Sequence, residues 1–362
     1  MKKIVLAMSG GTDSSVSAII LQQAGYTIEG ISFKMWDNYH LSSCDDKNHG
    51  CCNAEMLLEA RELAKNLDFP HNIIDIRDEF DHYVIQNFIS EYKQGRTPNP
   101  CVVCNTHIKW GLLLDEMKKL GYSKYATGHY ARIREKNGRY ILQRGVDLKK
   151  DQSYFLWTLN QKQLSHTIFP LGEFTKAKVR EIARENGFEH IAEKKESQEI
   201  CFIPDNNYRH FLRDTVPCIE ETPGEGWFVD KHRNKLGKHK GFPFYTIGQR
   251  RGLNVALGYP VYVVSINASK NTIVLGKYSD LQQQALHIKN CNWIKYPQPP
   301  TNTPFDIKIR YNTAPVAGQI KAIDKTDCHI VLEKPVHAIT PGQSAVLYEG
   351  DDVVGGGIIC QK

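Results

Sequence analysis

The sequence Ser9-Gly10-Gly11-Thr12-Asp13-Ser14-Ser15 directly follows a short apolar segment and has the composition of an anion-binding loop. Glycines let the backbone approach a charged ligand closely, and hydroxyls with first-turn amides can bind a phosphate at a helix start. Asp13 could hold a Mg²⁺ ion that bridges phosphate oxygens. Because no Gly-Lys-Ser/Thr follows, the loop is not of the Walker type. The alternative is a glycine-rich turn that binds nothing.

Thiols form the second group of candidate residues. Cys101 and Cys104 are spaced as Cys-Val-Val-Cys, and they stand between a proline-rich approach and an amphipathic segment. At a helix start the dipole would stabilise their thiolates, and we expect Asn105 to act as a cap there. Such a pair could be a nucleophile, a zinc ligand pair, a thioredoxin-like motif or an inert reduced pair. Cys201, between Ile200 and Phe202, is typical of a core residue when taken alone.

The chain contains ten cysteines, a number that indicates metal or redox chemistry rather than a disulfide framework when no leader peptide is apparent. Cys44, His49, Cys51 and Cys52 could bind zinc, but their irregular spacing favours a loop without metal. We expect the remaining four cysteines to fill positions in the core or on the surface without a chemical role, namely Cys218, Cys291, Cys328 and Cys360.

Positive charge is concentrated in residues 231–251, which hold seven Lys or Arg and no Asp or Glu. Phe242, Phe244 and Tyr245 are interleaved with these charges, as in surfaces that bind phosphates and bases. The alternative is a solvated loop.

These groups must be positioned by two different kinds of architecture. Up to about residue 202, β-rich segments at 3–8, 27–33, 71–76 and 125–129 alternate with helical periodicity at 14–24, 53–68 and 110–120. This alternation predicts an α/β fold with a doubly wound parallel sheet, whose ligands bind at the carboxyl ends of the strands. From residue 261 onward, short strands separated by turns predict an antiparallel β-barrel or sandwich.

We therefore predict three domains: a nucleotide-binding catalytic domain over 1–204, a small central RNA-binding domain over 205–260 and a C-terminal β-barrel over 261–362. The first residues have too short an apolar run for a signal peptide, and no apolar stretch is long enough to span a membrane. We expect a cytoplasmic protein.

The loop at residues 9–16 resembles the PP-loop of ATP pyrophosphatases, which cleave ATP to AMP and pyrophosphate and adenylate an oxygen on their substrate. Together with Thr97-Pro98-Asn99-Pro100, Cys104-Asn105 and Ile200-Cys201-Phe202-Ile203, it is similar to the tRNA-specific 2-thiouridylases, which act on the wobble uridine. Other segments that resemble the family in its order are Ala126-Thr127-Gly128-His129-Tyr130, Lys150-Asp151-Gln152-Ser153-Tyr154, Thr246-Ile247-Gly248-Gln249-Arg250, Arg310-Tyr311 and Pro341-Gly342-Gln343-Ser344.

The resemblance implies roles for individual residues. ATP would be bound by Ala7, Met8, Ser9, Gly10, Gly11, Thr12, Asp13 and Ser14, with Phe33 and Gly128. Cys201 would carry a persulfide, received from a sulfur-relay protein or a cysteine desulfurase, and Cys104 would be the nucleophile that forms a disulfide with Cys201 or frees sulfide from it. The target base would meet Asn99, Pro100 and Cys101, with His129 and Gln343 nearby. The tRNA anticodon arm would be held by Lys150, Asp151, Gln152, Arg310 and Tyr311, and the protein would be a monomer or dimer.

Two positions depart from the family pattern. Many members have Asp where this chain has Cys101, and Met is common where it has Phe33. Cys101, Cys104 and Cys201 are three thiols that could hold a [4Fe–4S] cluster with one open iron. A persulfide relay and cluster-assisted transfer therefore both remain open. Competing functions are tRNA binding without turnover, a PP-loop amidotransferase or ligase, and a zinc-ribbon regulator.

Overall fold

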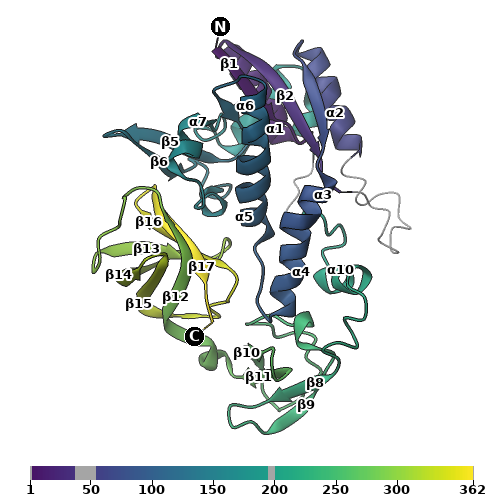
Figure 1. Cartoon of the computed structure of the whole chain (residues 1–362), viewed down its shortest axis with the longest axis vertical. Helices are drawn as coiled ribbons and strands as arrows, with labels where there is room; N and C mark the ends of the chain where they lie inside the picture. The colour runs from purple at the N-terminus through teal and green to yellow at the C-terminus, as the bar shows by residue number, and fades with distance from the viewer. Residues whose placement is uncertain (1, 37–53, 195–199, 362) are drawn as a thin grey trace.

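The computed structural model describes residues 2–36, 54–194 and 200–361 (Figure 1). Its N-terminal part is built on a parallel sheet of five strands in the order β3-β2-β1-β4-β7. The central strand β1 is buried on both faces, with Ile4, Val5 and Leu6 fully inaccessible. The strands are β1 (Lys2–Ala7), β2 (Tyr26–Lys34), β3 (His71–Asp75), β4 (Tyr125–Ala126) and β7 (Thr167–Ile168).

Helices cover both faces of this sheet, and two separate hydrophobic cores result. One core contains residues of α1 (Thr12–Gln23), α2 (Ala54–Asn66), α8 (Lys176–Glu185) and α9 (Glu189–Ala192). The other contains residues of α5 (Pro100–Cys104), α6 (Leu113–Lys119) and α7 (Gln161–His166). The predicted doubly wound α/β fold is therefore confirmed.

The helix expected over 110–120 begins ten residues earlier than predicted. Backbone angles stay helical from α5 through a π-type segment, Asn105–Leu112, into α6. Asn105 is therefore inside a continuous helical run rather than at its cap, and that expectation is wrong. A second run joins α3 (Arg77–Phe80), a π-type segment (Asp81–Ile85) and α4 (Gln86–Lys93).

The C-terminal part is a closed antiparallel barrel, as predicted. Its strand order is β12-β15-β14-β13-β16-β17, and β12 also pairs with β17. The hairpin β5–β6 (Ala131–Lys136 and Arg139–Arg144) extends the same sheet through a contact of β6 with β17. The barrel strands are β12 (Gln282–Trp293), β13 (Pro304–Lys308), β14 (Val316–Asp324), β15 (Asp327–His337), β16 (Ser344–Glu349) and β17 (Asp352–Ile359).

A central part lies between these two, with helix α10 (Tyr208–Thr215) and a four-stranded sheet in the order β10-β11-β8-β9. Its strands are β8 (Gly226–Val229), β9 (Lys235–His239), β10 (Tyr262–Asn267) and β11 (Thr272–Gly276). From the short strands after residue 261, the sequence predicted that β10 and β11 belong to the barrel. In the structure β11 pairs with β8 instead. A local strand pattern cannot indicate which sheet a strand joins.

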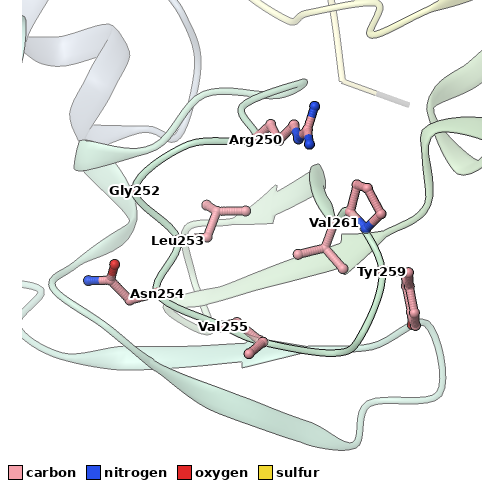
Figure 2. Close-up of a pocket in the computed structure, with 9 residues that line it drawn as sticks. Arg250, Gly252, Leu253, Asn254, Val255, Tyr259 and Val261 are labelled. Carbon is pink, nitrogen blue, oxygen red and sulfur yellow. The ribbon is translucent and has the colours of Figure 1, made fainter.

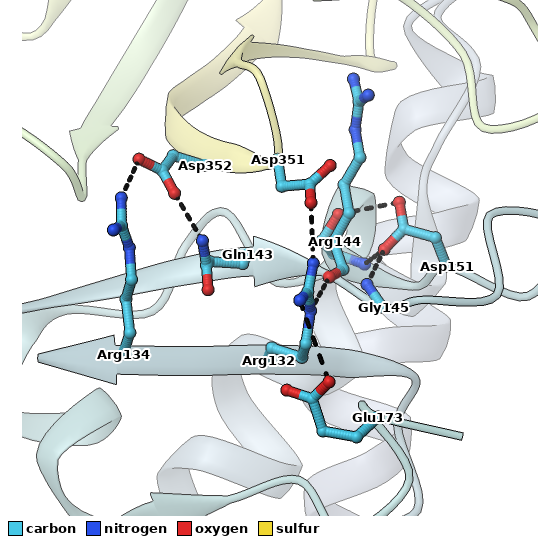
Figure 3. Close-up of polar contacts among 10 residues, drawn as sticks. Arg132, Arg134, Gln143, Arg144, Gly145, Asp151, Glu173, Asp351 and Asp352 are labelled. Atoms are coloured by element: carbon cyan, nitrogen blue, oxygen red, sulfur yellow. Dashed lines mark hydrogen bonds and ion pairs between the residues drawn. The ribbon is translucent and has the colours of Figure 1, made fainter. Parts of the chain in front are cut away.

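Charged side chains attach the β5–β6 hairpin to the barrel (Figure 3). Arg132 Nη2 lies 2.8 Å from Asp351 Oδ2, and Arg134 Nη2 lies 2.5 Å from Asp352 Oδ2. Beside them, the buried Trp157 indole donates to Ser344 Oγ at 2.9 Å. The barrel is thus fixed to the N-terminal part by both a shared sheet and polar contacts. Within the described residues, no helix is long and apolar enough to cross a membrane.

Candidate active site

The loop between β1 and α1 adopts a conformation that requires glycine. Gly10 has φ +73°, and a Cβ atom there would lie 2.1 Å from the Met56 carbonyl oxygen. Ser14 Oγ accepts from Ser9 N at 3.2 Å and donates to Gly11 O at 3.1 Å, which closes the turn. Gly11 is the N-cap of α1 and supplies no side-chain bond to the first-turn amides. Such amides favour an anion.

Asp13 has partners that its sequence neighbours do not indicate. Its Oδ1 accepts from Lys176 Nζ at 2.6 Å and from Tyr130 Oη at 2.8 Å. Lys176 is only 8 % exposed and stands at the start of α8, so a buried cation faces the loop. A second lysine, Lys194, donates to Gly10 O at 2.8 Å. Both ammonium groups thus lie beside the loop, where Lys176 pairs with Asp13 and Lys194 pairs with Glu59.

Contacts continue from this loop toward the thiols through the segment after β4. A Cβ atom on Gly128 would lie 2.9 Å from the Asp13 carbonyl carbon, so the two backbones are in contact. The next residue is His129. Its Nδ1 lies 2.7 Å from Thr127 Oγ1, and its Nε2 lies 3.4 Å from Lys109 Nζ. Burial lowers the pKa of His129 well below its usual value, and the Lys109 charge lowers it further. The ring is therefore neutral at pH 7 and accepts from Lys109.

Cys101 and Cys104 lie on α5, whose start is set by Asn99 and Pro100. The Asn99 side chain accepts from Val102 N at 3.5 Å, and proline suits the first helical turn because it needs no amide donor there. Asn105 is buried, and its Nδ2 donates to Phe155 O at 3.0 Å. The N-cap is thus Asn99.

Cys201 is held at the surface by its neighbour. Phe202 is 2 % exposed, and its ring lies 5.3 Å from those of Phe88 and Phe211 and 5.9 Å from that of Phe80. Cys201 itself is exposed. The aromatic anchor at Phe202 thus fixes the backbone of Cys201 at the surface.

The three thiols and Lys109 are close enough to affect one another's charge. Burial of the thiols, followed by the charge of Cys104, raises the pKa of Cys101 to about 11 and that of Cys201 to about 12. The pKa of Cys104 is also raised by burial, and Cys104 raises the pKa of both other thiols. Lys109 lowers the pKa of all three. The expected low-pKa thiolate is therefore not found, because crowding outweighs the helix dipole.

Comparison with known proteins adds a full-length match. Models described as the tRNA methyl transferase HUP domain, PRC-barrel domain and aminomethyltransferase beta-barrel domain match residues 2–205, 209–277 and 283–359. A tRNA-specific 2-thiouridylase MnmA of Amoebophilus asiaticus is 51 % identical over 99 % of this chain and 96 % of its own length. Proteins of the same name from Salinibacter ruber and Clostridium perfringens are 46 % and 45 % identical, each over 99 % of this chain and over 94 % and 98 % of their own lengths.

This chain belongs to the tRNA-specific 2-thiouridylase family. Among solved structures, a 4-thiouridine synthetase–RNA complex with bound ATP matches 60 % of this chain and 51 % of that one at 17 % identity and a TM-score of 0.38, too weakly to carry an argument.

Several residues that the thiouridylase resemblance assigned to tRNA make contacts within the protein. Asp151 is buried and accepts from Gly145 N and from Ser153 N and Oγ, as Figure 3 shows in part. Gln152 Oε1 accepts from Tyr130 N at 3.0 Å. Lys150 lies in the same turn, where its amide donates to Asp147 O. The turn is thereby held rigidly beside the Gly128 segment.

The barrel residues of this assignment lie at the edge that faces the thiol helix. Arg310 Nη2 donates to Ala338 O at 2.7 Å and also bonds Thr340 Oγ1, and burial lowers the pKa of Arg310. Tyr311 packs on Phe155, with ring centres 4.5 Å apart. Gln343 Nε2 donates to Pro98 O at 2.8 Å.

Three charged residues of the site were missed by sequence reasoning, namely Lys109, Lys176 and Lys194. Lys109 and Lys176 stand in helical segments and Lys194 follows α9, and none of them has a motif of its own. Phe33, which was predicted to help bind ATP, is partly buried. It packs against the core that contains residues of α5, α6 and α7, and against the core of Phe88 and Phe202, which Cys104 also contacts. Cys44, Cys51 and Cys52, the candidate zinc ligands, lie outside the described residues.

Proposed function

We propose that this protein is an ATP-dependent tRNA-uridine 2-sulfurtransferase that acts on the wobble uridine. The observation that supports it best is the series of contacts from Asp13 through Gly128 and His129 to Lys109, whose charge lowers the pKa of all three thiols. A nucleotide at the loop, the nucleophile Cys104 on α5 and the sulfur carrier Cys201 would thus meet one base. Family membership supports the same reaction.

The chemistry needs both parts of the site. C2 of uracil is a poor electrophile, and its oxygen is a poor leaving group. In the proposed reaction this oxygen attacks the α-phosphorus of ATP, pyrophosphate leaves, and the oxygen becomes part of an AMP leaving group. The outer sulfur of a persulfide on Cys201 then attacks C2, and AMP departs. Cys104 finally attacks the inner sulfur, which releases the thiolated base and leaves a Cys104–Cys201 disulfide for an external thiol to reduce.

Magnesium would arrive with the nucleotide. Mg²⁺ bound to a nucleotide commonly takes only one or two protein carboxylates, so the single carboxylate of Asp13 fits this role. Lys176 already neutralises one oxygen of that carboxylate. Lys176 and Lys194 would add attraction for the phosphates from the protein itself.

The cluster-assisted alternative uses Cys101, Cys104 and Cys201 as ligands. In the conformation described, residues 2–36, 54–194 and 200–361 contain no group of three His, Cys, Asp or Glu side chains spaced to hold a metal ion. Iron and acid-labile sulfide measured on anaerobically purified protein would decide, and stoichiometric iron would favour the cluster.

The tRNA would be bound by the central part, which includes Arg250 and Arg251, and by the turn at Lys150. Arg250 stands at the rim of a hollow of about 350 Å³ formed by residues 250–261 (Figure 2). Neutralising Arg250 and Arg251 together should weaken tRNA binding and reduce its salt dependence by about one unit for each phosphate that the protein no longer neutralises. An unchanged salt dependence would argue against this surface. A sulfur-relay protein or cysteine desulfurase as donor, a cytoplasmic location and a monomeric or dimeric state remain predictions.

The decisive experiment combines purified protein, unmodified tRNA, ATP and a persulfide donor, with mass analysis of the wobble nucleoside. We expect 2-thiouridine to appear with release of pyrophosphate, and we expect Cys104→Ser and Cys201→Ser to abolish it. Cys218→Ser changes an exposed thiol of the central part and is the matched control. Binding without pyrophosphate release would instead indicate a tRNA-binding protein. Pyrophosphate release that persists in full in both cysteine variants would favour a PP-loop amidotransferase or ligase.

A further inference from the structure

A turn of the barrel, Pro341 to Gln343, touches the chain just before the thiol helix. Thr97 N donates to Pro341 O at 2.9 Å. In the opposite direction, Gln343 Nε2 donates to Thr97 O at 3.2 Å and to Pro98 O at 2.8 Å. The barrel thus contacts the backbone of the approach segment through three hydrogen bonds.

Gly342, in the middle of this turn, permits the close approach. Its φ is +91°, and a Cβ atom there would lie 2.6 Å from Thr97 O and 3.0 Å from Glu91 Oε2. Side chains do not tolerate a Cβ contact below 3.0 Å, least of all with a backbone oxygen. Any residue larger than glycine would therefore displace Thr97 or the turn by at least a few tenths of an ångström.

The turn is the better fixed of the two partners. Gly342 N donates to Ile359 O at 2.9 Å, and Ile359 N donates to Gln343 O at 2.8 Å, so the turn is bonded to the last strand, β17. The other end of β17 is joined to β6 and to the arginines of β5 (Figure 3). A clash at Gly342 would consequently move Thr97.

The segment after Thr97 is stiff. Pro98 and Pro100 have fixed φ angles, and Asn99 between them caps α5 through its bond from Val102 N. A shift of Thr97 would therefore reach Cys101 and Cys104 without being absorbed by flexible backbone.

We infer that the turn at Pro341 to Gln343 is a positioning device for the nucleophilic helix. It holds α5 in place before any RNA is bound, so Gly342 and Gln343 act on the reaction through Cys104. The effect of this turn on turnover rests on the proposed function. Its effect on the position of Cys101 and Cys104 does not depend on that function.

The test compares Gly342→Ala with Gly350→Ala. Gly350 lies in the β16–β17 turn with φ +59°, and a Cβ atom there would meet no described atom within 4 Å, so this control carries the backbone penalty without the clash. The first measurement is the rate of iodoacetamide labelling at Cys104 in free protein, followed by peptide mass spectrometry. The second is kcat for thiolation beside the Kd for tRNA.

We expect Gly342→Ala to change the labelling rate several-fold and to lower kcat by about 10- to 100-fold, because sub-ångström misplacement of a reacting group costs rates of that order. The Kd for tRNA should stay within about twofold. Gly350→Ala should match the wild type in all three. Equal labelling and equal kcat in the two variants would overturn the inference, as would a loss confined to tRNA affinity.

If Gly342→Ala does not fold, Gln343→Met removes the side-chain donor to Thr97 O and Pro98 O at similar volume. Because Gln343 is also a candidate contact of the base, only the labelling rate of Cys104 in free protein is compared for this variant, and an unchanged rate would overturn the inference. If the wild-type protein has no thiolation activity, the proposed function fails, and the labelling rates alone decide the positioning role.

Discussion

Replacing Asp352 with alanine should destabilise the protein far more than the same change at its neighbour Asp351. The Asp352 side chain is 6 % exposed and accepts from Arg134 Nη2 at 2.5 Å and from Gln143 Nε2 at 2.7 Å, as Figure 3 shows. It also accepts from Lys295 Nζ at 2.6 Å. The Asp351 side chain is 54 % exposed and pairs with Arg132 at 2.8 Å. Both aspartates pair with an arginine of β5, so the two variants compare a buried carboxylate with three donors against an exposed carboxylate of the same turn.

The expected cost follows from what each deletion leaves behind. Removing one partner of a buried ion pair costs about 3–5 kcal/mol, because the other charge stays buried and unpaired. Here the Arg134 side chain is 42 % exposed and Lys295 keeps Glu349 as a partner, so solvent and Glu349 recover part of the loss. We therefore expect about 2–4 kcal/mol for Asp352→Ala. For Asp351→Ala we expect at most about 1 kcal/mol.

The difference should also depend on pH. Burial alone would raise the pKa of Asp352, but the bonds from Lys295, Gln143 and Arg134 outweigh it and hold that pKa below its usual value. A carboxylate with a lowered folded pKa stabilises the fold above the unfolded value of about 3.9, and the stabilisation is lost as pH falls through the folded value. The gap between wild type and Asp352→Ala should therefore be full at pH 7 and shrink in acid below about pH 4.

Urea unfolding followed by circular dichroism at pH 7 and at a series of acidic pH values measures both effects. The double variant Asp351→Ala/Asp352→Ala checks whether the two losses add. Equal destabilisation by the two single variants would refute the reasoning from burial. A gap that widens in acid would refute the assignment of the carboxylate as charged and bonded.

Two further variants test the site lysines. Lys109→Met should slow iodoacetamide labelling of Cys104 several-fold at pH 8, since the ammonium lowers the pKa of that thiol. Lys109→Arg keeps the charge and should label at the wild-type rate. An unchanged labelling rate in Lys109→Met would contradict the electrostatic role. Lys176→Met should raise the Kd for ATP about tenfold, the value of one charge-assisted hydrogen bond. Lys178→Met changes an exposed lysine of the same helix and should not affect the Kd for ATP measured by equilibrium dialysis. Equal Kd values for the two variants would show that Lys176 does not contribute to nucleotide binding.

Sequence reasoning was most successful where local chemistry determines local structure. The glycines at 10 and 11 after a buried strand required a tight turn into a helix, and that turn is found. The alternation of strands and helices likewise predicted the parallel sheet. The prolines around Asn99 indicated a helix start near Cys101, although the cap was assigned to Asn105 instead of Asn99.

Features that depend on distant partners could not be predicted. Lys176 is buried only because α8 packs against α1 and the loop, and no neighbour in the sequence indicates this. Cys104 has a raised pKa because other segments crowd it, whereas the sequence suggested only the helix dipole. The pairing of β11 with β8 also depends on the whole central sheet rather than on either strand.

The hairpin β5–β6 has one more consequence, which concerns how the protein is made. It is synthesised early, yet its partner β17 is among the last segments of the chain, and the contact of Arg132 with Asp351 spans 219 residues. Because translation proceeds at about 5–20 residues per second, the nascent chain waits roughly ten seconds or more with β6 as an uncovered edge. Uncovered edges pair readily with other chains. A product truncated before β17 should therefore aggregate, even though its nucleotide-binding part is complete.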